Sequence, residues 1–591
     1  MRHLLTRSAF DLRVERPELV HARSGYWCAL DLAFSVVLCP ENEQAQRVNG
    51  HVETSNGNLQ EQVLACEQLG PEAVFDFFEK CIELASTDGR KGVLRFILPR
   101  EEGYLVRTDL LNFRLIDCDH VVDHISDFGA HERIFTPVAA TPNSIGGLVE
   151  LVVGSIGALC VLDGTSLLRE EKLRLLDAEL EKRISFPWTS KIQPRRKTLV
   201  LFEGRPDREY GRQMYTAAVA LNIDIVVLDR PGHWIEGPKY AHWRKVFIPI
   251  DIMPDTGLTA RIVDAVRSYG QPVDGIVCFA DPMLVSVAEA AKQLGLSMAS
   301  PEAFGICTDK YKSRTAAGMP ALRVSSVEAV DRIDINDNFR FPLIVKPILG
   351  WNSEGTCKVA DLQELKAAMQ SFNASLRSTS VVIENYCDGP EVNANLIIAD
   401  GDLVFYEVND DFPKSGDMAL AESHGASNAE VNFLENVTAF PSALPKSEQD
   451  MVVRDLHKLL LRIGFTTGVF HMESRIQNSS MEYKVGPNGL LDLSTRQIED
   501  STNPKPTNFL IEINARPPGP HDSLPCTLAY GIDLPAASIL FAVGETERAR
   551  QLMYPFSGEP QVWYEEWLCA APHGGDFPIG RCLRRAAGAM S

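Results

Sequence analysis

The stretch FLIEINARPPG, residues 509–519, places the strongest constraint on the fold. Its apolar positions alternate with Glu512, Asn514 and Arg516, which are spaced by two residues. In a β-strand these three side chains lie on one face. They make poor core material, because burying an unpaired charge is costly. The sequence therefore predicts a strand whose polar face meets a ligand, and hard oxygen donors suit Mg²⁺.

A second carboxylate stands at the end of another apolar strand. In GVFHMESR, Glu473 follows a run of mainly apolar residues. If the two strands pair antiparallel, Glu473 lies beside Glu512, and both glutamates with Asn514 can bridge one or two Mg²⁺ ions. Taken alone, Glu473 and Arg475 also fit ordinary strand-end charges that face water. Together with Glu512, Asn514 and Arg516 they favour the metal site.

Length and composition define the class of protein. A chain of 591 residues exceeds one ordinary core, and about 100 to 200 residues per domain indicate roughly three or four domains. With 45% hydrophobic and 23% charged residues, the composition is that of a globular protein. A formal net charge of −21 argues against nucleic-acid and membrane-surface partners, because both are polyanionic.

The termini and cysteines favour a cytoplasmic protein. The first residues contain Arg and Glu where a secretory signal needs an unbroken apolar stretch. The longest apolar stretch, residues 148–162, is interrupted by glycines and is shorter than the ~20 residues that span a bilayer. The 13 cysteines include no CxxC pair, which favours reduced thiols over a disulfide framework or a zinc site. We therefore expect no membrane span.

Four segments are expected to fold as separate units: residues 1–190, 198–305, 306–380 and 381–591. The basic stretch 191–197 reads as a linker. In the second segment, buried-type strands at 198–202, 223–228 and 275–279 alternate with helical stretches. This alternation predicts a parallel sheet with both faces covered. The role of the first segment stays open, since it could mediate dimerisation or cover the active site.

The later segments carry further strands. PLIVKP and VVIENY read as strands separated by a helix. An irregular region, residues 409–445, precedes an amphipathic helix at 447–462. Residues 477–508 are rich in Asn, Ser, Pro and charge and form an excursion between strands at 467–475 and 509–515.

Two lysines are placed for phosphate binding. Lys310 lies in CTDKYKSR, and Lys346 ends the strand PLIVKP before a loop. Singly, each is more often a solvated surface lysine, because Lys is usually exposed. The loop GWNSEG, residues 350–355, contains Ser353 and Gly355, and small residues allow backbone N–H groups to close over phosphates.

The strand VVIENY and the turn after it offer a nucleotide hinge. Glu384 and Tyr386 stand at the end of this strand, and Glu391 follows a Gly-Pro turn. Such a hinge can present backbone groups to an adenine and a carboxylate to a ribose. A hairpin with exposed acids fits the same pattern equally well.

Taken in order, these residues resemble the ATP-grasp superfamily over residues 198 to about 560. The resemblance implies two α+β lobes that close on ATP, preceded by a parallel-sheet pre-ATP-grasp domain and by an extra N-terminal α/β domain. The implied phosphate contacts are Lys310, Lys346, Ser353 and Gly355; the implied hinge residues are Glu384, Tyr386 and Glu391; and the implied ligands of Mg²⁺, or of Mn²⁺, are Glu473, Glu512 and Asn514.

One region narrows the resemblance, and three features depart from it. Residues 420–445, chiefly PSALP at 441–445, resemble the linker of L-amino acid ligases and carnosine synthase-like enzymes. Glu354 adds an anion to the phosphate loop, the insertion after Arg475 is longer than a hairpin needs, and Pro517–Pro520 stiffen the substrate-side loop. The identity of the substrates therefore cannot be carried across.

The resemblance implies a ligase that joins a carboxylate, such as an amino acid, to an amine through an acyl phosphate, releasing ADP and phosphate. Lys346 and Arg516 are the expected catalytic residues, acting on the phosphoryl group and on the carboxylate or oxyanion. His424 and His521 could deprotonate the amine or line its pocket, although a lone His is more often structural. The expected partners are a small-molecule carboxylate, an amine and a second copy in a homodimer. A biotin-carboxylase-like enzyme and a non-catalytic ATP-binding module are the alternatives.

Overall fold

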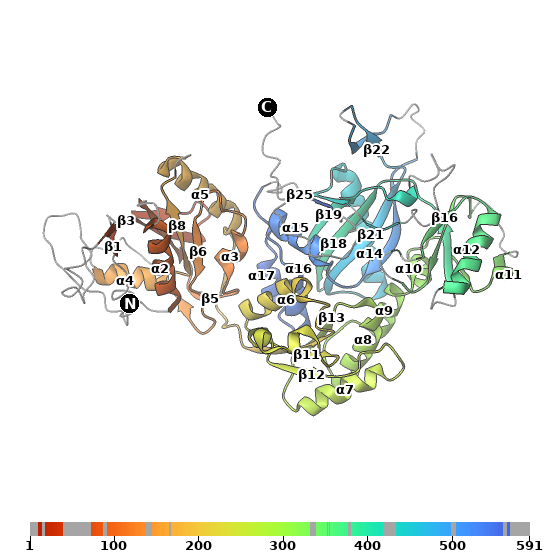
Figure 1. Cartoon of the computed structure of the whole chain (residues 1–591), viewed down its shortest axis with the longest axis horizontal. Helices are drawn as coiled ribbons and strands as arrows, with labels where there is room; N and C mark the ends of the chain where they lie inside the picture. Colours follow the sequence, from red (N-terminus) through yellow and green to blue (C-terminus); the bar gives the residue numbers. More distant parts are fainter. Residues whose placement is uncertain are drawn as a thin grey trace.

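Four parts of the chain make up the molecule, and the large lobe lies between the N-terminal domain and the small lobe (Figure 1). The N-terminal domain lies at one end, a parallel-sheet domain lies below the centre, and a small and a large lobe make up the rest. The computed structural model describes residues 10–14, 18–38, 72–86, 91–137, 145–164, 167–330, 338–350, 353, 355–375, 380–417, 433–435, 437–487, 489–497, 504–558 and 564–567.

The N-terminal domain is built on a six-stranded sheet in the order β1-β3-β4-β8-β6, with β2 paired to β3. Every strand pairing described in this sheet is antiparallel. Helices α2 and α4 cover one face, and α3 and α5 cover the other, so β4 is buried on both sides. The elements are β1 (Phe10–Val14), β2 (Glu18–His21), β3 (Trp27–Leu38), α2 (Glu72–Ser86), β4 (Lys91–Pro99), α3 (Leu110–Arg114), β6 (His124–Asp127), α4 (Ile145–Gly154), β8 (Gly157–Leu162) and α5 (Arg169–Arg183). A small sheet joins β5 (Gly103–Leu105), β7 (Ile134–Phe135) and β9 (Thr189–Ser190).

The second domain contains a four-stranded sheet in the order β12-β11-β10-β13, and its pairings are parallel. The three strands predicted from the sequence are present as β10, β11 and β13, with bounds that shift by one residue. The elements are β10 (Lys197–Phe202), α6 (Arg208–Ala220), β11 (Ile223–Asp229), η3 (Trp234–Glu236), η4 (Pro238–Trp243), β12 (Val246–Pro249), α7 (Leu258–Tyr269), β13 (Gly275–Cys278), η5 (Asp281–Met283), α8 (Leu284–Leu294) and α9 (Pro301–Cys307).

The small lobe is an antiparallel sheet in the order β14-β17-β15-β16, packed against two helices. Antiparallel pairing of β15 and β17 places Lys346 and Glu384 near one another at the lobe's edge. The elements are α10 (Lys310–Ala316), β14 (Leu322–Val324), α11 (Val327–Val330), β15 (Leu343–Pro347), β16 (Cys357–Val359), α12 (Leu362–Ser375) and β17 (Val381–Asn385).

The large lobe has a six-stranded sheet in the order β24-β21-β18-β19-β20-β25, backed by α14. Its elements are β18 (Glu391–Ala399), β19 (Asp402–Asp411), β20 (Val437–Phe440), α14 (Lys446–Ile463), β21 (Gly468–Gln477), β24 (Thr507–Asn514) and β25 (Tyr564–Trp567). The prediction that residues 409–445 are irregular was wrong at both ends, because β19 continues to Asp411 and β20 begins at Val437. The excursion between β21 and β24 contains a hairpin of β22 (Met481–Val485) and β23 (Leu491–Thr495).

Three C-terminal helices join the domains: α15 (Pro520–Tyr530), α16 (Leu534–Ala542) and α17 (Thr546–Leu552). They lie between the N-terminal domain and the large lobe (Figure 1). Asp533, at the N-cap of α16, pairs with Arg107 of the N-terminal domain at 2.7 Å, and Arg548 donates to the Val106 carbonyl. The core that begins in the N-terminal domain therefore continues into these helices.

In the described part of the chain, no single helix is long and apolar enough to cross a membrane. Helices α15 and α16 meet that test only as a pair, and the pair is bent by 103°.

Candidate active site

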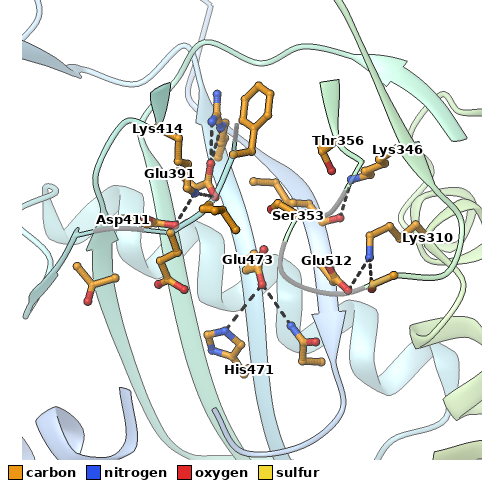
Figure 2. A pocket seen from close by; sticks show the side chains of 18 of the residues that line it. Lys310, Lys346, Ser353, Thr356, Glu391, Asp411, Lys414, His471, Glu473 and Glu512 are labelled. Carbon is orange, nitrogen blue, oxygen red and sulfur yellow. Dashed lines mark hydrogen bonds and ion pairs between the residues drawn. The ribbon is translucent and has the colours of Figure 1, made fainter. Parts of the chain in front are cut away.

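A cavity of about 690 Å³ is lined by residues of the parallel-sheet domain and of both lobes. Nearly all of the predicted site residues line it: Lys310, Lys346, Ser353, Glu384, Tyr386, Glu391, Glu473, Glu512, Asn514 and Arg516. Gly355 is not among the lining residues; it is exposed and has a φ of +75°. Figure 2 shows Lys310 and Lys346 on one side, Glu391, Asp411 and Lys414 on the other, and Glu473 and Glu512 between them.

The two predicted metal-binding carboxylates lie on adjacent strands. Strands β21 and β24 pair antiparallel, and Glu473 is directly opposite Glu512, as the sequence predicted. Asn514, two residues further on, donates its side-chain amide to Glu473 at 3.4 Å. Burial, and next the charge of Glu512, raise the pKa of Glu473 to about 8. Two crowded carboxylates and an amide oxygen form a donor set that fits Mg²⁺, since a divalent cation would relieve their repulsion.

Both predicted phosphate-binding lysines are buried at the cavity wall. Lys310 Nζ lies 2.8 Å from Glu512 Oε1 and 3.2 Å from the Gly350 carbonyl. Lys346 Nζ lies 2.8 Å from Glu384 Oε1. Burial is the largest influence and acts to lower the pKa of Lys310, but the charge and hydrogen bond of Glu512, together with the charges of Glu473 and Asp281, outweigh it, so the pKa is raised. The reading of these residues as ordinary surface lysines is wrong for this structure.

Residues at the end of β17 take the position predicted for a nucleotide hinge. The Glu384 carboxylate lies between Lys346 and Arg314, each at 2.8 Å. The Tyr386 hydroxyl donates to Asp417 at 2.9 Å, and Lys358 lies 3.7 Å from the centre of its ring. Exposed hairpin acids are therefore excluded for Glu384, which is 3% exposed. Its predicted role towards a ribose stays a prediction.

A buried charge network around Glu391 was not foreseen. Lys414 pairs with Glu391 and with Asp411, and Arg475 joins Glu391 at 2.7 Å to Asp417 at 2.8 Å. These cations lower the pKa of Glu391 to about 2, although burial acts to raise it. The alternative that Arg475 faces water was wrong, because its side chain is buried and paired with carboxylates. The signal that was overlooked is the run VNDDFPK, where polar residues end a strand.

Of the predicted phosphate loop, Gly350 lines the cavity, and so does Ser353. It has a φ of +51° and lies near Thr356 and Lys346 at the cavity wall (Figure 2). Glu354, which departs from the family pattern, lies outside the described residues, as does His424.

At the end of the cavity near the parallel-sheet domain, Arg516 contacts a carboxylate from a distant segment of the chain. Arg516 is paired with Asp281 at 2.7 Å and donates to Asn514 at 3.3 Å. His521 contributes to the same end, 3.3 Å from the hydroxyl of Tyr210. Sequence reasoning missed Asp281 and Arg205, because nothing in their local pattern marks them.

Comparisons with known proteins agree with this arrangement. A family model described as the ATP-grasp N-terminal domain matches residues 215–297, and one described as the ATP-grasp domain matches residues 339–491. The ATP-grasp enzyme fsqD of Aspergillus fumigatus is 36% identical over 485 residues, which cover 81% of this chain and 83% of that protein.

More distant proteins share smaller parts of the chain. Carnosine synthase 1 of Gallus gallus is 24% identical over 57% of this chain and 33% of its own length. The crystal structure of an L-amino acid ligase from Bacillus licheniformis is 19% identical, covers 65% of this chain and 82% of that chain, and has a TM-score of 0.46. The Aspergillus relative is the stronger match, because its identity extends over most of both chains. The resemblance seen in the sequence is thereby confirmed: the chain belongs to the ATP-grasp family.

Proposed function

We propose that this protein uses ATP to phosphorylate a carboxylate and then joins the acyl group to an amine. The family provides ATP-dependent ligase activity with ATP and Mg²⁺; the acyl phosphate, the amine and the amide product are our proposal. The observation that carries it is one cavity wall on which Glu473, Glu512 and Asn514 lie between two buried lysines and Arg516.

The lysines would act on the nucleotide. Among the described residues, the short side-chain contacts of Lys310 and Lys346 are to carboxylates and a carbonyl oxygen, and those contacts can be exchanged for phosphate oxygens. A buried ammonium is worth more to a transferring phosphoryl group than one in water, because the local dielectric is low. Mg²⁺, held by Glu473, Glu512 and Asn514, would neutralise charge on the phosphates.

Arg516 would orient the acid. Its guanidinium lines the cavity next to Asn514, and its contact with Asp281 fixes its plane. A planar fork of donors suits a carboxylate before transfer and an oxyanion after attack by the amine. No protein nucleophile is needed, so catalysis would depend on positioning, charge stabilisation and exclusion of water.

The test is incubation of the purified protein with MgATP and pooled carboxylates and amines, chiefly amino acids. Mass spectrometry should find ADP, phosphate and a condensed amide that forms only when both substrates are present. AMP with pyrophosphate would contradict the acyl-phosphate route. Carboxylation of a substrate by bicarbonate would favour the biotin-carboxylase-like alternative, and a melting shift with MgATP but no nucleotide consumption would favour a non-catalytic module.

A further inference from the structure

The end of the cavity near the parallel-sheet domain lies at the point where the strand order reverses. Strand β10 lies between β11 and β13, and the chain leaves β10 towards β11 before it returns on the other side. Loops at the carboxyl ends of β10 and β13 therefore diverge, which is where open α/β sheets bind ligands. Arg205 follows β10, Phe279 and Asp281 follow β13, and all three line the cavity.

Arg205 is held there by a backbone conformation that is rare outside glycine. Its φ is +70°, and Glu203 has a φ of +65°. Two indole and imidazole nitrogens fix the loop, because Trp234 Nε1 donates to the Arg205 carbonyl at 2.7 Å and His233 Nε2 lies 2.8 Å from it. The adjacent Gly204 N–H donates to Asp229 at 2.7 Å. Strained positions that the surroundings hold in place occur mainly at functional sites.

The partners of Arg205 differ from those of the structural arginines. Arg95 forms a two-pronged pair with Asp31, with both bonds at 2.7 Å, and Arg475 holds Glu391 and Asp417 at 2.8 Å or less. Among the described residues, the contacts of the Arg205 guanidinium are long: the Glu203 carboxylate at 3.8 Å and the Phe279 carbonyl at 3.4 Å. Within the described residues, Arg205 therefore lacks the short carboxylate contacts that Arg95 and Arg475 have.

The charges around Arg205 leave this corner receptive to an anion. Burial lowers the pKa of Arg205 and raises that of Glu203, and the contact between the two groups is long, at 3.8 Å. Arg516 is the second cation at this end of the cavity, and Asp281 is its ion-pair partner. Phe279 provides an apolar wall, with its ring centre 5.5 Å from the guanidinium carbon.

We propose that Arg205 is a specificity-determining residue that binds a second substrate carboxylate, one that is not phosphorylated. The proposal rests on the proposed function, because Arg516 is assigned to the reacting carboxylate and the two lysines to phosphate. The second carboxylate belongs either to the amine substrate or to a dicarboxylic acid. A planar guanidinium binds either by two parallel hydrogen bonds.

Binding is tested first, on the whole chain with MgADP. The probes are the 20 standard L-amino acids, their α-carboxamides, and succinate and glutarate with their monoamides, each scored by the shift in melting temperature. At least one carboxylate should stabilise the wild type while its amide does not. Arg205→Gln should abolish the response, Arg205→Lys should restore part of it, and Arg208→Gln, an exposed neighbour, should leave it intact.

Turnover then shows whether the second carboxylate belongs to the amine substrate or to the acid. For substrates that condense, loss of the non-reacting charge or of Arg205 should raise KM by about 10- to 100-fold. Impaired α-carboxamides of the amine would assign the carboxylate to the amine substrate, and impaired monoamides of the acid would assign it to the acid. The inference would be overturned, and the ligase activity left standing, by equal turnover of amides and carboxylates or by an unchanged KM in Arg205→Gln. Arg205-dependent binding without condensation would overturn the ligase and leave the inference.

Two results would overturn the inference outright, whatever the enzyme does. One is a wild type that none of the carboxylate probes stabilises, and the other is a wild type that each carboxylate and its amide stabilise equally. If Arg205→Gln lowers the melting temperature of the free protein, the wild-type comparison of each carboxylate with its amide decides alone.

Discussion

Lys346 and Lys414 are both buried lysines that line the same cavity, but their counter-ions differ. Among the described residues, Lys346 has one carboxylate partner, Glu384, which also has Arg314 as a partner. Lys414 has two, Glu391 and Asp411, in a network that Arg475 closes. A lysine can move to a phosphate when its carboxylate partner has a second cation, as Glu384 has in Arg314. Lys414 cannot leave in the same way, because two buried carboxylates depend on its charge. Burial alone does not identify a binding lysine; the charge balance of its partners does.

The largest expected effect concerns turnover at the lysine–metal end. Glu512→Gln and Lys346→Ala should abolish ADP release, at least about 100-fold, because each removes charge that the phosphoryl group needs. Melting temperatures should stay near that of the wild type. Glu547→Gln, whose side chain is 92% exposed, is the control and should turn over normally. Normal turnover in either site variant would contradict the site assignment.

Stability should separate the two lysines next. Lys414→Met leaves Glu391 and Asp411 buried without their shared cation, and we expect a loss of about 3 to 5 kcal/mol in the free energy of unfolding. Urea unfolding measures it. Lys446→Met is the matched control, because Lys446 is 64% exposed and its ion pair should contribute less than about 1 kcal/mol. Equal losses in the two variants would remove the distinction between the lysines.

Nucleotide affinity should show the opposite ranking. Lys346→Met keeps the length of the side chain but removes its charge, and should weaken MgATP binding by roughly 10- to 100-fold. Its stability should change less than that of Lys414→Met, because Glu384 retains Arg314. Isothermal titration with MgATP gives the affinity. Unchanged affinity would mean that Lys346 belongs to the structural class with Lys414.

The smallest effect concerns pH. Burial raises the pKa of Glu407 to about 7, and its donors among the described residues are two side-chain amides, whereas two cations lower the pKa of Glu391 to about 2. A raised pKa means that Glu407 holds its proton more tightly in the folded chain than in the unfolded one. Its contribution to the free energy of unfolding therefore falls as pH rises from about 4.5 to about 7. Glu407→Gln should therefore gain in melting temperature relative to the wild type across that range. A difference that does not vary with pH would contradict the expectation.

Prediction from sequence succeeded where a local pattern reflects a local cause. Alternation by two residues placed Glu512 and Asn514 on one face of β24, and it also allowed Glu473 to be expected opposite Glu512. The strand prediction was wrong for Arg516, because β24 ends at Asn514. Prediction failed for Asp411, because acidic residues are depleted in strands and its run was interpreted as irregular. It also missed that Lys414, which follows the strand, pairs with Asp411. In the structure their charges compensate one another, which no single-residue propensity can express.

The sequence by itself determined the family and the alternation that puts Glu512 and Asn514 on one strand face, because strand periodicity and a characteristic order of residues are properties of the chain. Only the tertiary structure decided which charges meet. Lys310 and Glu512 are 202 positions apart yet lie 2.8 Å from one another, and Arg516 meets Asp281 across 235 positions. Such pairs depend on how whole domains pack, so the absence of a short carboxylate contact to Arg205 among the described residues is a property of the fold.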